Sequence, residues 1–252
     1  MLPVKRAALI LLAILAASCS NAQVRKFTPK VVKEYPHDTG AYTQGLFFHN
    51  GTLYETTGQY GESCIRTVDL ASGKPIINKK LNSKYFGEGS AVMGDNLYVL
   101  TWTNRVAFIY DAKTLSYKKT VSYPRQGWGL TTDGTRLYAT DGSSTLYVLD
   151  GDLKVQKKVQ VKLNDKPMRN LNELEYIDGK IWANVYLTDM IVIIDPKDGK
   201  VEATVNCKGL LPDSLRTQNT DVLNGIARDE AGNIYLTGKH WPRLYQIELI
   251  KK

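Results

Sequence analysis

The sequence predicts an all-β protein, a five-bladed β-propeller whose last blade is closed by the N-terminal strand. Three observations support this prediction: a repeated segment, strand-like patterns within it, and one strand too few in the last copy. A polar or Gly-rich opening followed by two apolar strands around a Gly/Asn/Asp turn begins near residues 43, 87, 127, 171 and 223. A repeat of about 40–50 residues that holds about four strands is typical of a propeller.

The strands of each repeat can be read in order. The second strands begin at Leu53, Leu97, Leu137, Ile181 and Ile234, and each of the first four repeats continues with a third strand and a basic fourth strand. Lysine on outer strands guards against edge pairing. The fifth repeat ends with its third strand, "RLYQIELIKK", and the segment "TPKVVKEYPHD" at 28–38 has the character to supply the missing fourth strand. We therefore expect both chain ends to share one blade.

The N-terminus predicts export. Residues 1–18 combine a basic start, an apolar run of 11 residues (7–17) and small residues before Cys19, which matches a secretory signal too short to span a membrane. Cys19 is expected to be lipidated, as in a bacterial lipoprotein; plain cleavage after Ala22 is the alternative. The predicted organisation is a signal peptide (1–18), a short linker (19–27) and one catalytic domain (28–252), lipid-anchored in the bacterial envelope, in the periplasm or at the outer membrane.

Charge, cysteine and histidine usage narrow the function classes. The net charge is +8, but lysine is scattered over repeat edges, so no nucleic-acid partner is expected. Cys64 and Cys207 could pair in an exported protein or remain free. The three histidines have no metal-site spacing, so neither a metal nor another cofactor is expected. We expect a monomer that meets the membrane only through its lipid anchor. The three histidines considered above as metal ligands are His37, His49 and His240.

The repeat openings predict the binding site. In a propeller the first strand of each blade lines the central channel, so polar residues that open the repeats converge on one face, where a concave pocket is the default binding site. These residues are Gln44, Glu88, Gln126, Trp128, Asn172, Glu173 and Asn224. The distal ends of second strands add Trp102, Tyr186 and Lys239.

The same segments resemble a known family. "YTQGL", "YFGEG", "LTW", "QGWGL", "LNELEY", "WANVY" and "LTGKHWPRLYQIEL" occur in order over about residues 30–250, and the chain is similar to plant and bacterial glutamine cyclotransferases. The resemblance implies a five-bladed propeller that converts the N-terminal glutamine of peptides or proteins to pyroglutamate and releases ammonia. It implies that Glu88 is the acid/base residue and that Tyr42 and Phe86 form an aromatic wall. Implied pocket residues are Gln44, Trp102, Trp128, Asn172 and Lys239. At Tyr186 plant members carry Trp, which bears on peptide preference.

These residue types suit an intramolecular aminolysis. A single carboxylate near the amine can act first as base and then as acid, and indole N–H, amide and ammonium groups can stabilise an oxyanion. Glu173 and Glu175 are rival carboxylates, for which a structural or pocket-wall role is expected. Trp182 and Trp241 are expected in the core. The Asp residues that end third strands are expected to cap turns: Asp69, Asp111, Asp150 and Asp195.

Two other function classes remain open from the sequence. A non-catalytic surface propeller would bind peptides or proteins at the channel mouth and would need the aromatic pocket but no placed carboxylate. A metal-dependent hydrolase would need several His, Asp or Glu ligands at the same mouth, a requirement that the three histidines meet poorly.

Overall fold

The computed structural model describes residues 23–252. The predicted signal peptide, the lipidation at Cys19 and the alternative cleavage after Ala22 lie outside the described residues. Within the described part of the chain, no helix is long and apolar enough to cross a membrane.

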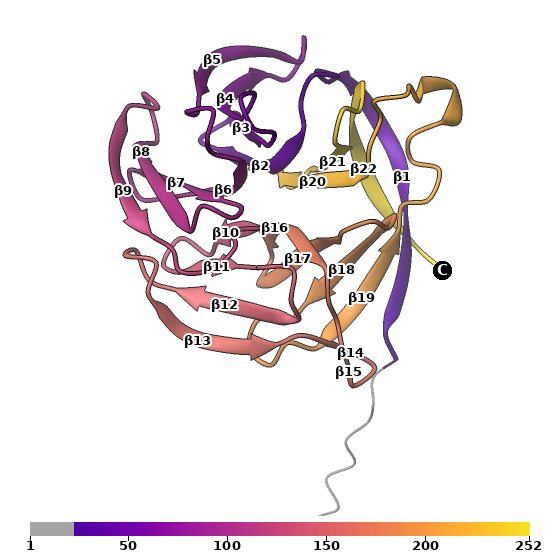
Figure 1. The fold of residues 1–252 in the computed structure, drawn as a ribbon. Coiled ribbons are helices and arrows are strands. Elements are labelled where there is room, and N and C mark those ends of the chain that lie inside the picture. The colour runs from indigo at the N-terminus through magenta and orange to yellow at the C-terminus, as the bar shows by residue number, and fades with distance from the viewer. Residues whose placement is uncertain (1–22) are drawn as a thin grey trace, which may run out of the picture.

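The protein has an all-β fold with several four-stranded antiparallel sheets, preceded by β1 (Arg25–Pro36) (Figure 1). The first two groups of strands are β2 (Thr43–His49), β3 (Thr52–Thr57), β4 (Cys64–Asp69) and β5 (Lys74–Lys80), then β6 (Gly87–Met93), β7 (Asn96–Thr101), β8 (Val106–Asp111) and β9 (Tyr117–Ser122). The third and fourth groups are β10 (Leu130–Thr132), β11 (Leu137–Ala139), β12 (Thr145–Leu149) and β13 (Val155–Gln160), then β16 (Leu171–Ile177), β17 (Lys180–Val185), β18 (Met190–Ile194) and β19 (Val201–Asn206). The last group is β20 (Leu223–Arg228), β21 (Ile234–Gly238) and β22 (Arg243–Lys251).

The N-terminal strand lies beside the C-terminal one, as the sequence predicts. β1 pairs antiparallel with β22, from Phe27 opposite Lys251 to Pro36 opposite Arg243. Its first residues also pair in parallel with β19, so the last two groups form one eight-stranded sheet with β1 between them. β1 begins at Arg25, within the segment predicted as linker. The sequence did not indicate this second pairing.

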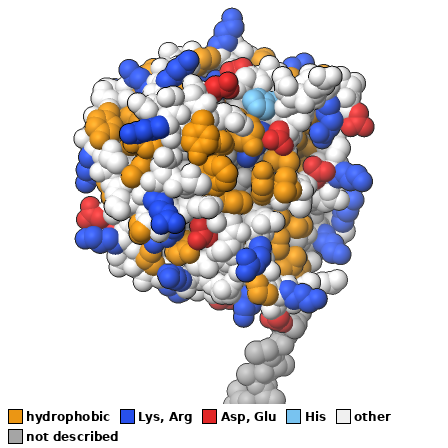
Figure 2. Space-filling view, in the orientation of Figure 1, with side chains coloured by type: hydrophobic (Ala, Val, Ile, Leu, Met, Phe, Trp, Pro, Cys, Tyr) orange, Lys and Arg blue, Asp and Glu red, His pale blue; other side chains and the backbone are white. Residues whose placement is uncertain are grey.

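The inner strands of the five groups meet at the centre. β2 contacts β6, β6 contacts β10, β10 contacts β16, β16 contacts β20, and β20 contacts β2. These strands are almost fully buried, whereas the outer β5, β9 and β13 are largely exposed and rich in lysine. Hydrophobic side chains gather in the middle of the face drawn in Figure 2, with charged side chains more frequent toward its edge.

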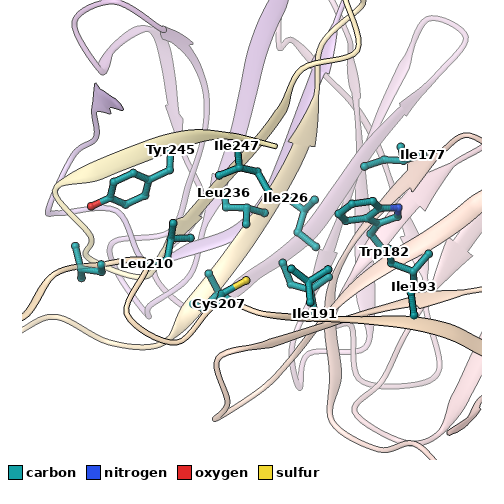
Figure 3. Packing of buried hydrophobic residues seen from close by; sticks show 14 of the residues in the cluster. Ile177, Trp182, Ile191, Ile193, Cys207, Leu210, Ile226, Leu236, Tyr245 and Ile247 are labelled. Atoms are coloured by element: carbon teal, nitrogen blue, oxygen red, sulfur yellow. The ribbon is translucent and has the colours of Figure 1, made fainter. Parts of the chain in front are cut away.

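Apolar side chains pack between neighbouring groups. Trp182 of β17 lies beside Ile191 and Ile193 of β18 and Ile226 of β20 in one cluster (Figure 3). Trp241 belongs to the same cluster, so both tryptophans are core residues, as predicted. A smaller cluster joins β2 and β3 to β20–β22, which packs the first group against the last.

The sequence left open whether Cys64 and Cys207 form a disulfide. Cys64 and Cys207 are buried free thiols.

The aspartates that end the third strands cap turns, as predicted. Each of the four accepts a hydrogen bond from a backbone N–H in the turn that follows its strand. The bonds run from Ser72 N to Asp69, Thr114 N to Asp111, Lys154 N to Asp150 and Lys197 N to Asp195.

Two irregular segments depart from the repeat. The connection between β13 and β16 carries a small hairpin, β14 (Lys162–Leu163) and β15 (Lys166–Pro167). The connection from β19 to β20, residues 207–222, contains a 3-10 turn, η1 (Asp213–Leu215). This long connection accounts for the wider spacing before the last repeat.

Candidate active site

Nine of the predicted residues line one pocket of about 150 Å³, where the inner strands begin. Tyr42 and Gln44 come from the start of β2, and Phe86 and Glu88 from the start of β6. The other lining residues are Trp102, Trp128, Asn172, Tyr186 and Lys239. A larger hollow of about 690 Å³ lies between the N-terminal segment and the β14–β15 hairpin, but no aromatic side chain lines it. The smaller pocket therefore carries the candidate chemistry.

Bulges aim the polar residues into the centre. The register between first and second strands shifts at Gln44, at Glu88, at Asn172 and at Asn224, in four different groups. A bulge inserts an extra residue and turns its side chain away from the regular alternation. Close approach of the inner strands requires glycine beside Glu88, because a Cβ on Gly89 would lie 2.5 Å from backbone atoms of the third group.

Glu88 is a buried carboxyl without a charged partner. Its side chain is 4% exposed, and no hydrogen bond or ion pair reaches its carboxyl oxygens within the described residues. Burial raises the pKa of Glu88 well above its ordinary value, and the nearby Lys239 charge opposes that shift. A carboxyl with a raised pKa is a stronger base, when ionised, than a solvated carboxyl, which suits a group that takes up a proton and returns it.

The pKa of Lys239 shifts in the opposite direction. It is 2% exposed, and burial lowers its pKa to about 8, against the opposing charges of Glu88 and Asp221. Its Nζ lies 4.3 Å from the ring centroid of Tyr42 and 5.0 Å from that of Tyr186. The two aromatic faces hold the ammonium at the pocket wall, so Lys239 is a buried pocket residue and not a solvated one.

Aromatic rings form the rest of the wall. Phe86 packs edge-on against Tyr42 at 5.9 Å and Trp102 at 5.6 Å, and Trp128 packs edge-on against Tyr186 at 5.6 Å. Trp102 is still 37% exposed at the mouth. Such a wall can hold an aliphatic side chain and exclude water.

Gln126 does not line the pocket; it joins the two tryptophans at its rim. Its Oε1 accepts hydrogen bonds from Nε1 of Trp102 and Nε1 of Trp128, each at 3.2 Å. Both indole N–H groups are therefore occupied, which removes them as free oxyanion donors in this state. The structure favours a positioning contact for Gln126 over the direct substrate contact expected from its place in the repeat.

Amide groups complete the floor. Asn172 is buried, and its Oδ1 has no hydrogen-bond partner in the described structure. Gln44 Oε1 accepts a hydrogen bond from Nδ2 of Asn224 at 3.1 Å, so Asn224 supports the pocket from behind without lining it. A buried acceptor without a partner is costly, which marks Asn172 Oδ1 as a place for a substrate N–H.

Glu173 and Glu175 are buried but do not line the pocket, although the sequence analysis grouped Glu173 with the polar residues that converge there. Glu173 accepts N–H bonds from Leu46 at 3.2 Å and Ile226 at 2.9 Å. Glu175 accepts bonds from Arg228 N at 3.2 Å and the Thr131 hydroxyl at 3.4 Å. Both carboxyl groups therefore join inner strands, the structural role that was expected for them.

Asp221 was missed by the sequence analysis. Its backbone N–H donates to Lys239 O at 3.0 Å, and its carboxylate raises the pKa of Tyr42, after burial as the larger cause. It lies in the irregular connection 207–222, where no periodic signal exists. Among the described residues, no group of three His, Cys, Asp or Glu side chains is placed to hold a metal ion.

Comparisons with known proteins identify relatives of this chain. The sequence model of the family described as glutamine cyclotransferase matches residues 5–249. The chain is 45% identical over 226 residues to the glutaminyl-peptide cyclotransferase of Arabidopsis thaliana, covering 87% of this chain and 71% of that protein. The crystal structure of Myxococcus xanthus glutaminyl cyclase superposes with a TM-score of 0.85 at 34% identity, covering 91% of this chain and all of that one.

Proposed function

The chain belongs to the glutamine cyclotransferase family, and from that premise we propose how its pocket performs the reaction. The protein is a glutaminyl-peptide cyclotransferase, an enzyme that converts an N-terminal glutamine to pyroglutamate with release of ammonia. The observation that carries the residue assignment is the unpaired, buried Glu88 carboxyl beside Lys239. Such a group destabilises the fold, so its presence supports a chemical role over a non-catalytic binding module.

Glu88 moves the protons. Its carboxylate takes a proton from the α-amine of the substrate as the amine nitrogen forms a bond to the side-chain amide carbon. The same carboxyl then protonates the leaving nitrogen, the C–N bond breaks, and ammonia departs from the closed ring. Burial makes the carboxylate a stronger base than a solvated one, and the enclosed pocket holds the two reacting groups in contact.

Lys239 and Asn172 bind the reacting amide. The Lys239 ammonium, with a pKa of about 8, is charged at neutral pH and can donate to the oxygen on which negative charge develops. Asn172 Oδ1 accepts a hydrogen bond from an N–H of the substrate, which supplies the partner that this buried oxygen otherwise lacks. Tyr42, Phe86 and Tyr186 enclose the aliphatic stem, and the two tryptophans joined by Gln126 form the outer wall.

We also infer that the five groups of strands close into a five-bladed propeller. The circuit of contacts from β2 through β6, β10, β16 and β20 back to β2 supports this architecture. The pairing of β1 with β22 supports a last blade shared by both chain ends. The same arrangement supports one catalytic domain from 28 to 252.

The site of action is proposed from the N-terminal sequence. An apolar run before Cys19 supports export and lipid anchoring in a bacterial envelope. Peptides or proteins that begin with glutamine are the partners, and the enzyme acts as a monomer without a cofactor. The test of the function is ammonia release from a glutamine-initiated dipeptide amide. An N-acetylated peptide is the control, because its blocked nitrogen cannot attack.

A further inference from the structure

A second buried charge cluster lies beside the pocket and takes no part in the proposed chemistry. Arg66 of β4 donates to Glu55 of β3 through Nε at 2.9 Å and Nη2 at 2.7 Å, and to Asp38 through Nη1 at 2.7 Å. The His37 ring contacts the other oxygen of Glu55 at 3.0 Å. The side chains of His37, Glu55 and Arg66 are almost fully buried.

Both ring nitrogens of His37 face acceptors. Nε2 faces Glu55 Oε1, and Nδ1 lies 2.7 Å from the carbonyl oxygen of Trp241. A third neighbour, the Thr237 hydroxyl, is 3.3 Å from Nδ1, but it donates its own proton to Arg243 O and offers only a lone pair. A neutral imidazole has one N–H and one lone pair, so only the imidazolium satisfies this environment.

The charge balance leads to the same protonation state. Asp38 and Glu55 carry two negative charges, and Arg66 carries one positive charge. With a neutral His37 the single Arg66 charge would be shared between the buried Glu55 and the 40% exposed Asp38, so Glu55 would lose one of its two cationic partners, at a cost to stability. Burial alone would lower the pKa of His37, but the Glu55 carboxylate and the hydrogen bonds outweigh burial and raise it. The same contacts hold the pKa of Glu55 at about 2 despite its burial.

The cluster holds the two segments that supply one side of the pocket. His37 binds the loop after β21 twice, through Nδ1 to Trp241 O and through its backbone N–H to Pro242 O at 3.1 Å. In the other direction His240 N donates to Ala41 O at 2.7 Å. Lys239 immediately precedes this loop, and Tyr42 follows Ala41. A loss of the His37 contact would therefore release the Lys239 wall of the pocket.

We propose that His37 works as a permanent imidazolium and is the positioning residue that holds Lys239 and Tyr42 in place for cyclisation. The kinetic part rests on the proposed function, whereas the protonation state does not. A failed activity assay of the wild-type enzyme would thus leave the protonation test intact.

The first test is spectroscopic and uses the wild-type protein. Histidine-selective ¹⁵N labelling with long-range ¹H–¹⁵N correlation reports whether each ring nitrogen carries a proton. We expect both nitrogens of His37 to be protonated from pH 6 to pH 8, with His49, outside the cluster, as internal reference. A lone-pair nitrogen on His37 at pH 7 would overturn the proposal.

The second test compares two neutral replacements. His37→Asn keeps an N–H donor at the position of Nδ1, facing Trp241 O, whereas His37→Gln extends its amide toward Glu55 and loses the contact with Trp241. Both remove the same charge and should lower the melting temperature similarly. Because a hydrogen bond of this kind is worth about tenfold in an equilibrium, we expect kcat to fall about tenfold in His37→Gln and by less than about threefold in His37→Asn. Equal kcat values, or the reverse order, would contradict positioning through Trp241.

Discussion

Replacement of Glu88 by glutamine separates the chemistry of the pocket from its stability. Glutamine has nearly the same shape as glutamate, so Glu88→Gln leaves no cavity at this 4% exposed position. It cannot act as a base near neutral pH. Proton transfer by a placed side chain is worth about 10²–10⁴-fold, which corresponds to roughly 3–5 kcal/mol of the activation free energy at 1.36 kcal/mol per tenfold. We expect kcat to fall by at least the lower figure.

The same replacement should not destabilise the fold. Burial raises the pKa of Glu88, so the folded state disfavours its charged form relative to the unfolded state. Removal of the charge relieves that penalty, and the melting temperature should equal or exceed that of the wild type. Loss of turnover without loss of stability would separate a catalytic role from a structural one.

The rate–pH profile provides the decisive assay. Glu88 must be deprotonated to accept a proton, so kcat/KM should fall as the pH drops through its raised pKa, well above the range of an ordinary carboxyl. This acidic limb should vanish in Glu88→Gln. In Lys239→Met it should move to higher pH, because the Lys239 charge holds the pKa of Glu88 down. A Glu88→Gln enzyme with near-normal ammonia release would refute the assignment, and Asp221 would be the next carboxyl to test.

Four further outcomes are expected. Trp128→Phe should raise KM with little change in kcat, because the indole N–H is already bound to Gln126; a large fall in kcat in steady-state kinetics would instead place that N–H at the transition state. Truncation of the chain through Pro36 removes nine paired positions with β22 and should lower the melting temperature by at least about 10 °C, because even four backbone hydrogen bonds of about 1 kcal/mol each correspond to a shift of that size; an unchanged value in a thermal melt would contradict a shared last blade. The depressed pKa of Glu55, about 2, contributes stability that is present above its unfolded pKa and lost as the pH falls toward 2; urea midpoints measured across that range should fall less in Glu55→Gln than in the wild type. Cys19→Ser should move the protein from the membrane fraction to the soluble fraction, and identical partitioning on fractionation would exclude a lipid anchor there.

The sequence predicts strands and pocket composition well because both depend on local patterns. Alternating apolar residues and Gly/Asn/Asp turns identify the strands, and the polar openings identify the pocket residues. The bulges at Gln44, Glu88 and Asn172 could not be predicted from the sequence. A bulge is a register shift between two paired strands, and neither strand alone carries a signature of it. The bulge at Asn172 also interrupts the alternation of side chains along β16, so Glu173 reaches backbone N–H groups of β2 and β20 instead of the pocket.

Contacts between segments that lie far apart in the sequence could not be predicted either. Gln126 was identified as polar and close to the site, but its bonds to two tryptophans depend on how the second and third groups of strands meet. His37 was considered only as a metal ligand, because Glu55 and Arg66 become its neighbours only when β1, β3 and β4 are placed in space. Charge clusters of this kind are properties of the assembled fold.

Three buried glutamates show how this fold assigns different roles to one residue type. Glu55 is buried beside two cationic side chains, and its pKa falls to about 2. Glu173 is buried among backbone N–H groups, whose bonds oppose but do not overcome the effect of burial, so its pKa is raised. Glu88 is buried without a cationic hydrogen-bond partner and without backbone N–H donors. Only the charge of Lys239 opposes the rise of its pKa. Burial alone therefore does not identify a catalytic carboxyl. What distinguishes Glu88 is that its oxygens have no protein partner among residues 23–252 and open on the pocket, so a substrate nitrogen can be the first group to bind them.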